Sequence, residues 1–237
     1  MTDTIEISGL CKSFFVDGQE LVVLKDLDLT LPANEITVLL GRSGCGKTTL
    51  LRLIGGLDKD YTGSIQTPQS RTAFVFQEAR LMPWLTVAQN IAFGLKKEEI
   101  DPAKIDGLIT LTGLDGFAQA LPRQLSGGMQ QRTALARALA MNPGFILMDE
   151  PFAALDHFTR EKMQQALLDI HKTNRCGVLF VTHSIDEAMA IADRIVVLED
   201  HKTKKVYPIG SLWRASCSEE DRRALREDIL SSIEFPQ

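Results

Sequence analysis

The stretch that decides the fold is Glu35–Thr49, which reads EITVLLGRSGCGKTT. Its first six residues form an apolar run of the length of a buried strand. Gly41–Thr48 then matches the pattern G-x-x-x-x-G-K-[ST] at every fixed position, and the residues after it predict a helix that begins near Gly46. A strand, a glycine-rich loop and a helix in this order indicate a loop that binds the phosphates of a nucleotide.

Each residue type in this loop has a chemical reason. Glycines let backbone N–H groups turn inward around phosphate oxygens, and the positive end of the helix dipole adds to the attraction. We expect Lys47 to bring a cation to the β- and γ-phosphates of ATP, and the Thr48 hydroxyl to bind Mg²⁺. The predicted nucleotide contacts of the loop are Gly41, Arg42, Ser43, Gly44, Cys45, Gly46, Lys47, Thr48 and Thr49.

The four cysteines fall into two classes. Cys45 is expected to supply a backbone amide to the loop, and its place at a helix start beside Lys47 also predicts a lowered thiol pKa and an alkylation that ATP slows. Cys11, Cys176 and Cys217 are interpreted as structural thiols, because the sequence pairs none of them in a CxxC motif.

The rest of the chain predicts an α/β fold. Buried-strand runs recur at residues 145–149 (FILMD), 178–183 (VLFVTH) and 194–198 (RIVVL), with helices expected to begin near Asp156 and Ser184. Strands that alternate with helices indicate a mainly parallel sheet. Residues 4–10, 21–31, 63–66 and 73–77 are further strand candidates, residues 86–141 favour helices, and residues 218–233 predict a closing amphipathic helix. The basic turn HKTKK at residues 201–205 is interpreted as a solvated loop.

Composition limits the classes of function. The chain has 237 residues, enough for one large domain, and 31 acidic against 26 basic residues give a net charge of −5. An acidic chain lacks the basic surface that binding to phosphate backbones requires, so we expect no nucleic-acid partner. No apolar run approaches the roughly 18 residues of a membrane span.

Hydrolysis of a γ-phosphate also needs a second metal anchor and a group that activates water. Asp149, at the end of the run FILMD, is placed to bind Mg²⁺ directly or through water. Glu150 follows it and is a candidate for polarising the attacking water, although it could instead be an acid at a helix start. The stretch LSGGMQQR at residues 125–132 resembles a second phosphate-binding helix start, because two successive glycines are costly inside a helix.

Five motifs together carry a family resemblance: GRSGCGKTT, FQEARLMPW, LSGGMQQR, FILMDEPFAALD and FVTHS, in this order. The chain resembles the ATP-binding subunits of ABC transporters over essentially its whole length. The resemblance implies a P-loop NTPase with a mainly parallel sheet, an antiparallel β region and an inserted helical subdomain. It divides one ABC ATPase domain, 1–237, into a core at 1–85 and 142–237 and a helical signature subdomain at 86–141.

The resemblance also implies roles for single residues. Phe14 would stack on adenine, with Phe15 as a rival and a core aromatic as the other interpretation of Phe14. Gln77 would reach Mg²⁺ and the attacking water, and His183 would contact the γ-phosphate. Asp156 would couple the two nucleotide sites of a dimer, or cap the next helix, or both.

In this family the signature serine and glycines close over the nucleotide of a second ATPase subunit, so Ser126, Gly127 and Gly128 are expected to complete a partner's site. An ordinary helix cap is the alternative for Ser126. The second subunit is expected to be another copy of this chain.

The motifs EARLMPWLTVAQNIAFGL and DEPFAALDHFTREKMQ are similar to those of importers for nitrate, sulfonates and taurine-like anions. This implies permease subunits in the membrane, a solute-binding protein, and a peripheral place on the cytoplasmic face. Trp84 would contact the permease, or pack inside its own subdomain. Three alternatives stay open: an importer for an unrelated solute, a soluble ABC-type ATPase of DNA repair or translation, and a small-molecule P-loop kinase.

Overall fold

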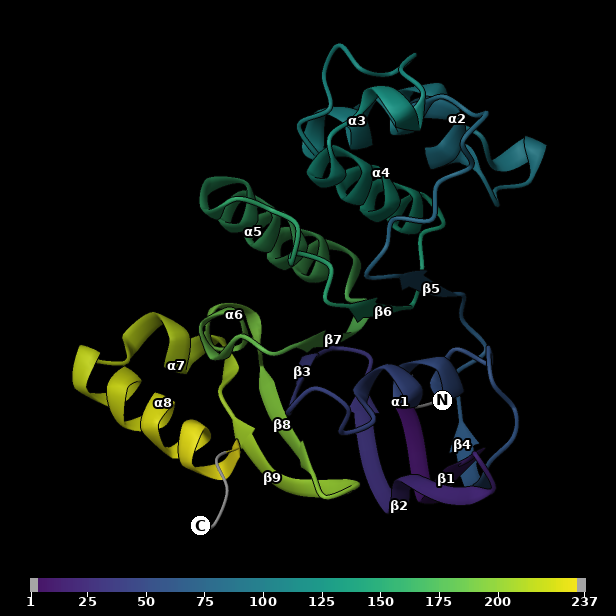
Figure 1. The fold of residues 1–237 in the computed structure, drawn as a ribbon. Coiled ribbons are helices and arrows are strands. Elements are labelled where there is room, and N and C mark those ends of the chain that lie inside the picture. The colour runs from purple at the N-terminus through teal and green to yellow at the C-terminus, as the bar shows by residue number, and fades with distance from the viewer. Residues whose placement is uncertain (1–3, 234–237) are drawn as a thin grey trace. The chain divides into compact units, whose positions relative to one another are not determined.

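The computed structural model describes residues 4–233, and the chain divides into two compact units. Unit 1 comprises Met1–Gln69 and Gly177–Gln237, and unit 2 comprises Ser70–Cys176. Figure 1 labels the α-helices and β-strands of both units. The predicted division into a core at 1–85 and 142–237 and a helical subdomain at 86–141 does not coincide with these two units, and it stays a prediction.

Unit 1 contains two groups of strands. The strands β1 (Thr4–Val16), β2 (Gln19–Pro32) and β4 (Thr62–Gln66) form an antiparallel sheet in the order β2-β1-β4. Next, β3 (Ile36–Leu40) pairs in parallel with β7 (Gly177–Thr182) on one side and β8 (Arg194–Glu199) on the other. All residues of β3 and β7 are buried, as expected of continuous apolar runs in a parallel sheet.

The turn HKTKK is not a solvated loop, and that prediction is wrong. Most of it belongs to β9 (Lys202–Pro208), which pairs antiparallel with β8. The lysines of β9 are exposed, whereas Tyr207 is buried. Lysine-rich sequences suit an edge strand because their charges oppose pairing with other chains.

Four helices complete the described part of unit 1. They are α1 (Lys47–Ile54), α6 (Ile185–Ile191), α7 (Gly210–Ser216) and α8 (Glu219–Ile233). The predicted helix starts near Gly46 and Ser184 and the closing helix are confirmed.

Unit 2 combines a pair of strands with a group of helices. Here β5 (Thr72–Val75) pairs in parallel with β6 (Phe145–Asp149), every residue of which is buried. Because β5 ends at Val75, Gln77 lies outside the strand. The helical elements are α2 (Val87–Ala92), η1 (Lys97–Glu99), α3 (Pro102–Leu111), η2 (Pro122–Gln124), α4 (Gly127–Ala140) and α5 (His157–Asn174).

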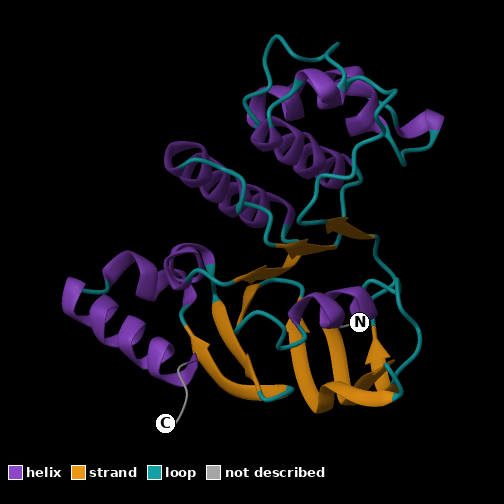
Figure 2. Ribbon diagram, viewed as in Figure 1, coloured by secondary structure: helices purple, strands orange, loops and turns teal. Residues whose placement is uncertain are grey.

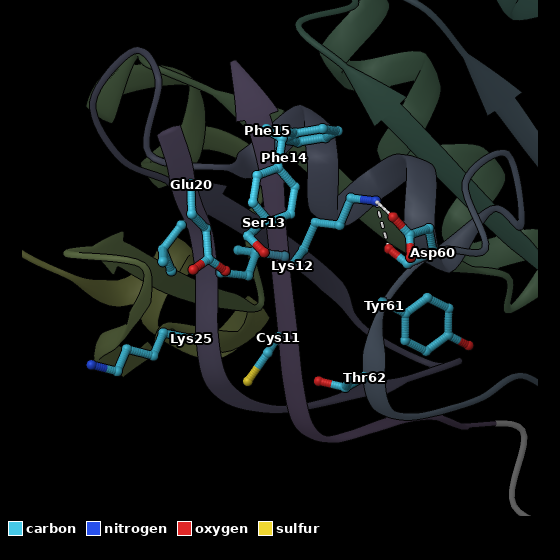
Figure 3. A pocket seen from close by; sticks show the side chains of 12 residues that line it. Cys11, Lys12, Ser13, Phe14, Phe15, Glu20, Lys25, Asp60, Tyr61 and Thr62 are labelled. Atoms are coloured by element: carbon cyan, nitrogen blue, oxygen red, sulfur yellow. Dashed lines mark hydrogen bonds and ion pairs between the residues drawn. The ribbon is translucent and has the colours of Figure 1, made fainter. Parts of the chain in front are cut away.

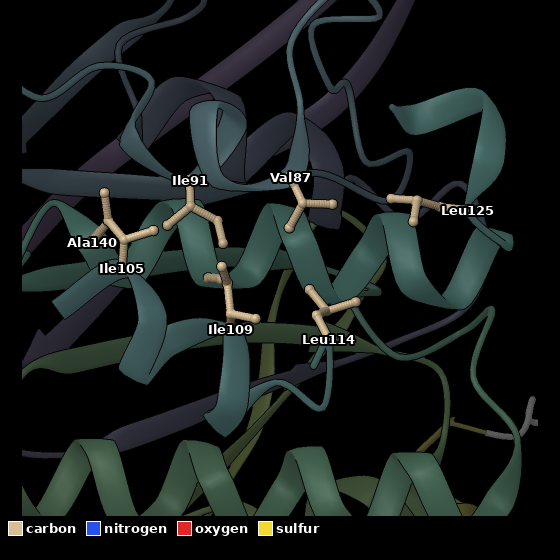
Figure 4. Packing of buried hydrophobic residues seen from close by; sticks show 8 residues of the cluster. Val87, Ile91, Ile105, Ile109, Leu114, Leu125 and Ala140 are labelled. Atoms are coloured by element: carbon tan, nitrogen blue, oxygen red, sulfur yellow. The ribbon is translucent and has the colours of Figure 1, made fainter. Parts of the chain in front are cut away.

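A small apolar core holds α2, α3 and α4 together, and Figure 2 shows this group as helices joined by loops. Figure 4 shows side chains from α2 and α3 directed at α4. Burial of each Val, Leu or Ile side chain in this core contributes about 1.5–3 kcal/mol. The members of the core are Val87, Ile91, Ile105, Ile109, Leu114, Leu125, Ala136 and Ala140.

Candidate functional site

The predicted phosphate loop lies between β3 and α1 in unit 1. Gly44 and Gly46 have φ angles of 84° and 100°, which are favourable only for glycine. A Cβ atom on Gly46 would also lie 2.8 Å from the carbonyl oxygen of Val23. The loop conformation therefore depends on these glycines, and it leads directly into the N-terminus of α1, the end of a helix whose backbone N–H groups can bind an anion.

Lys47 is the cation of this loop and is only 6% exposed. Its Nζ donates hydrogen bonds to the carbonyl oxygens of Gly41 (2.7 Å) and Arg42 (2.8 Å). Thr48, the next residue, is exposed at the start of α1. The ammonium group and the helix dipole therefore concentrate positive charge within one loop.

The prediction for the Cys45 thiol is wrong in sign. Burial raises the pKa of Cys45, and the nearby charge of Lys47 only partly offsets this effect. The sequence places the lysine beside the cysteine but does not show how far the thiol is removed from water, and desolvation opposes the thiolate.

We therefore expect slow alkylation of Cys45 at neutral pH, with a rate that rises as pH increases, because the thiolate is the nucleophile. Bound nucleotide should slow it further by covering the loop. Mass spectrometry of iodoacetamide-labelled peptides between pH 7 and pH 10 measures both effects, with Cys217 as an internal reference. Faster labelling of Cys45 than of Cys217 at pH 7.5 would contradict this expectation.

His183 lies beside the phosphate loop in unit 1. Because Leu40 of β3 is paired with Thr182 of β7, Gly41 and His183 follow the ends of neighbouring parallel strands. Ligands bind at this edge of doubly wound sheets. The hydroxyl of Thr182 donates to the buried carboxylate of Glu187 (2.6 Å) and accepts from the backbone N–H of Ser184 (3.0 Å), which fixes the turn that carries His183.

Unit 2 brings together the other predicted catalytic residues. Val75 of β5 is paired with Met148 of β6, so Gln77 and Glu150 each stand two residues beyond a paired position. Gln77 is exposed, whereas Asp149 is only 6% exposed at the end of its strand. Glu150 has a φ of 44°, a strained conformation for a non-glycine residue that is concentrated at functional sites.

The sequence did not reveal how the backbone on either side of Gln77, at residues 76–80, is held in place. Two side chains of α4 bind its backbone: Gln131 Nε2 donates to the Phe76 carbonyl (2.8 Å), and Arg137 donates to the carbonyls of Ala79 (3.0 Å) and Arg80 (2.9 Å). Burial lowers the pKa of Arg137. These contacts join residues more than 50 positions apart, so no local pattern could have predicted them.

Trp84 extends from the same segment and is 71% exposed, so the alternative of packing inside its subdomain is wrong. Asn90, which is fully buried, accepts from the backbone N–H of Met82 (2.8 Å) and donates to the carbonyls of Met82 and Leu85. These bonds fix the loop that exposes Trp84. The sequence signal for Asn90 was an amide within the apolar stretch LTVAQNIAFGL.

The signature residues begin α4. Ser126 caps the helix, and its Oγ accepts from the backbone N–H of Met129 (3.3 Å). The two glycines differ in their surroundings. A Cβ on Gly128 would lie 3.2 Å from Leu155 Cδ2, whereas a Cβ on Gly127 would meet no atom within 4 Å. Gly128 therefore permits close packing, and Ser126 and Gly127 present an exposed helix start.

Asp156 caps α5, as one of its interpretations predicted. Its carboxylate accepts from the backbone N–H of Thr159 (3.0 Å) and from the Thr159 hydroxyl (2.7 Å), and these hydrogen bonds lower the pKa of Asp156. Its role in coupling two nucleotide sites stays a prediction.

Phe14 and Phe15 line a cavity of about 570 Å³ in unit 1, which Figure 3 shows together with Lys12 and Asp60. Phe14 is 39% exposed and Phe15 is 79% exposed, so Phe14 is not a core aromatic. A cavity of this size is in the range of small-molecule sites. The structure leaves both rings available for stacking.

The described residues contain neither a cluster of metal-ligating side chains nor a membrane-spanning helix. Within residues 4–233, no three or more His, Cys, Asp or Glu side chains are grouped so that they could hold a metal ion. Over the same residues, no helix combines the length and the apolar character needed to cross a bilayer.

Residues 24–153 match the family of ABC transporters. The chain is 42% identical to "Aliphatic sulfonates import ATP-binding protein SsuB" of Bacillus subtilis (strain 168), covering 99% of this chain and 95% of that protein. It is 52% identical over 176 residues, 74% of each chain, to "Aliphatic sulfonates import ATP-binding protein SsuB 1" of Pseudomonas syringae pv. syringae (strain B728a).

Solved structures give the same result for the fold. A dimeric post-hydrolysis state of an ATP-binding cassette bound to ADP and Pi superposes with a TM-score of 0.80, at 31% identity, over 86% of this chain and 98% of that one. Along the chain, the phosphate loop comes first, the signature at the start of α4 follows, and the acidic strand end of β6 comes after it. The chain belongs to the ABC transporter family.

Proposed function

We propose that this chain is the ATP-hydrolysing subunit of an importer for aliphatic sulfonates or similar small anions. The observation that carries the proposal is the 42% identity, across 99% of the chain, to a protein named as an aliphatic sulfonates import ATP-binding protein. Of the other predicted substrates, taurine carries the same sulfonate group, and nitrate is likewise a small oxyanion. The chain works on the cytoplasmic face of the membrane.

In the proposed site, the phosphate loop binds ATP. The backbone N–H groups of the loop and Lys47 contact the phosphates, and the start of α1 adds its dipole. Phe14 stacks on adenine. Thr48, Gln77 and Asp149 would hold Mg²⁺, since their hydroxyl, amide and carboxylate oxygens suit this hard cation. When bound, Mg²⁺ neutralises charge on the β- and γ-phosphates.

Glu150 activates water in the proposed reaction. Its carboxylate accepts a proton from the water that attacks the γ-phosphorus, the bond from that phosphorus to the β–γ bridging oxygen breaks, and ADP leaves. Gln77 orients the water and His183 contacts the γ-phosphate. The strained backbone of Glu150 supports this role, because a φ of 44° would favour glycine if no side chain were needed.

We also propose that a second copy completes each site. Ser126, Gly127 and Gly128 of one copy contact the γ-phosphate held by the other, and Asp156 couples the two sites. The exposed helix start at Ser126 and the open space beside Gly127 support this role. ATP favours the closed dimer because it makes contacts there that the open state lacks.

The importer is tested by reconstitution. The chain is expected to copurify with permease subunits from detergent-solubilised membranes, and proteoliposomes with the cognate binding protein should hydrolyse ATP faster when an alkanesulfonate is added. Nitrate, taurine and an unrelated sugar are the comparison solutes. Absence of the chain from the permease fraction would favour a soluble ATPase, and stimulation by the sugar alone would contradict the proposed substrate class.

Trp84 is expected to contact the permease. Trp84→Ser should lower solute-stimulated hydrolysis in proteoliposomes by about tenfold, because a tryptophan buried at an interface contributes strongly to affinity. Hydrolysis by the isolated chain should not change. Phe117→Ser, which alters another exposed aromatic of unit 2, is the control and should leave both rates intact. Equal losses in the two assays would contradict this role for Trp84.

A further inference from the structure

A buried lysine lies beside the aromatic ring that we assign to adenine. Lys12 is only 4% exposed, although lysine is rarely buried without a partner. Its Nζ lies 4.7 Å from the centroid of the Phe14 ring, within the range of a cation–π interaction. Figure 3 shows both side chains projecting from β1 into the same cavity.

Two aspartates hold the ammonium group of Lys12 in this place. Nζ lies 3.0 Å from Asp58 Oδ2 and 3.2 Å from Asp60 Oδ2, and it donates to the Asp60 carbonyl at 2.5 Å. Burial acts to lower the pKa of Lys12, but the hydrogen bonds to Asp58 and Asp60 outweigh it and raise the pKa overall. Lys12 therefore carries its charge at neutral pH.

The aspartates belong to the segment between α1, the helix that follows the phosphate loop, and β4. The backbone N–H of Asp60 also donates to Asp58 Oδ1 (3.0 Å), which orders this segment around the ammonium group. Lys12 therefore connects the strand that carries Phe14 to the segment that follows the phosphate-loop helix. Both are parts of unit 1, so the connection fixes the ring with respect to that segment.

We propose that Lys12 is a positioning residue for the nucleotide base: it fixes the Phe14 ring and draws its electron density toward the ammonium group, which favours stacking of an electron-rich purine. The inference rests on the proposed function, in which Phe14 stacks on adenine. It assigns to Lys12, Asp58 and Asp60 a contribution to base affinity that is separate from phosphate binding.

The test compares two ligands that share phosphates and differ in the base. Lys12→Met keeps the apolar stem and removes the charge, and it should weaken ATP binding by about fivefold, the effect of one moderate cation–π contact. Inorganic tripolyphosphate, measured by calorimetry with Mg²⁺, should bind to Lys12→Met with the same affinity as to the wild type. Asp58→Asn, which preserves shape, should produce a smaller loss with the same selectivity.

The matched control is Lys25→Met. Lys25 lines the same cavity, but Figure 3 shows its side chain directed away from the Phe14 ring, so its loss should not change ATP affinity. In the Phe14→Ala background, Lys12→Met should have no further effect, because the ring through which it acts is gone.

The outcomes separate this inference from the function on which it rests. Equal losses for ATP and tripolyphosphate, or an undiminished effect of Lys12→Met in the Phe14→Ala background, would overturn the role of Lys12. ATP binding of wild-type strength by Phe14→Ala would overturn the stacking assignment itself. Failure of the wild type to bind either ligand would overturn the proposed ATPase.

Discussion

Glu150→Gln is expected to lower the rate of ATP hydrolysis by roughly 10²–10⁴-fold, the range that a general base contributes. Glutamine has the shape of glutamate but cannot accept the proton of the attacking water. ATP binding should be retained, because the phosphate loop lies on a different part of the chain. Since hydrolysis would no longer reopen the dimer, a long-lived ATP-bound dimer should accumulate.

Steady-state phosphate release and size-exclusion chromatography with ATP measure the two effects of Glu150→Gln. Glu161→Gln is the control, because Glu161 is an exposed carboxylate of α5 in the same unit, 3.8 Å from His157 Nε2. It should hydrolyse ATP at the wild-type rate. Wild-type turnover by Glu150→Gln would remove Glu150 from its assigned role, and so would full inactivity without the ATP-bound dimer.

Ser126→Arg is expected to abolish hydrolysis while leaving ATP binding by the monomer nearly intact. Ser126 is exposed, and the neighbouring Gly127 has open space around it, so an arginine can be accommodated without displacing the core. A bulky cation at this helix start would hold the second copy away from the nucleotide. The substitution also removes a helix cap, which costs about 1 kcal/mol of stability.

A second variant, Ser218→Arg, measures how much the loss of a helix cap alone affects stability and hydrolysis. Ser218 precedes α8, and its Oγ accepts from the backbone N–H three residues on, that of Asp221 (3.1 Å), as Ser126 Oγ does from Met129. Ser218→Arg should therefore show a similar loss of stability and retain hydrolysis. If the two variants lost hydrolysis equally, the effect of Ser126→Arg would reflect stability and not a shared site.

Mixed dimers test the sharing of sites directly. A Ser126→Arg chain combined with a Lys47→Ala chain should retain at most one working site, because one copy supplies an intact phosphate loop and the other supplies an intact signature. Hydrolysis by a purified monomer at dilutions that prevent dimer formation would contradict the requirement for two copies.

Much of the fold could be predicted because its signals are local. The buried runs of β3, β6 and β7, the phosphate loop and the caps at Asp156 and Ser184 each depend on a few consecutive residues. The edge strand β9 was missed, since its exposed lysines carry the pattern of a loop and its support comes from distant residues, through the pairing with β8 and the bonds to Asp228 of α8.

For the candidate site as well, local motifs could be predicted from the sequence, whereas burial and long-range contacts could not. Motif order was enough to name Lys47, Asp149, Glu150 and His183, but their assigned chemistry stays a prediction. The position of Cys45 beside Lys47 predicted the wrong direction for its pKa, because burial of the thiol depends on the folded environment and outweighs the charge of Lys47. The sequence also could not place Trp84, whose exposure depends on the hydrogen bonds made by Asn90.

The sequence by itself determined the family, the nucleotide loop and the helix starts, since these follow from backbone preferences and side chains within one short segment. Only the tertiary structure decided which distant segments meet. It placed His183 next to Gly41 through the register of β3 and β7, and it placed the ammonium group of Lys12 between Phe14 and Asp60. Such contacts depend on strand pairing and burial across long sequence separations, which no local pattern encodes.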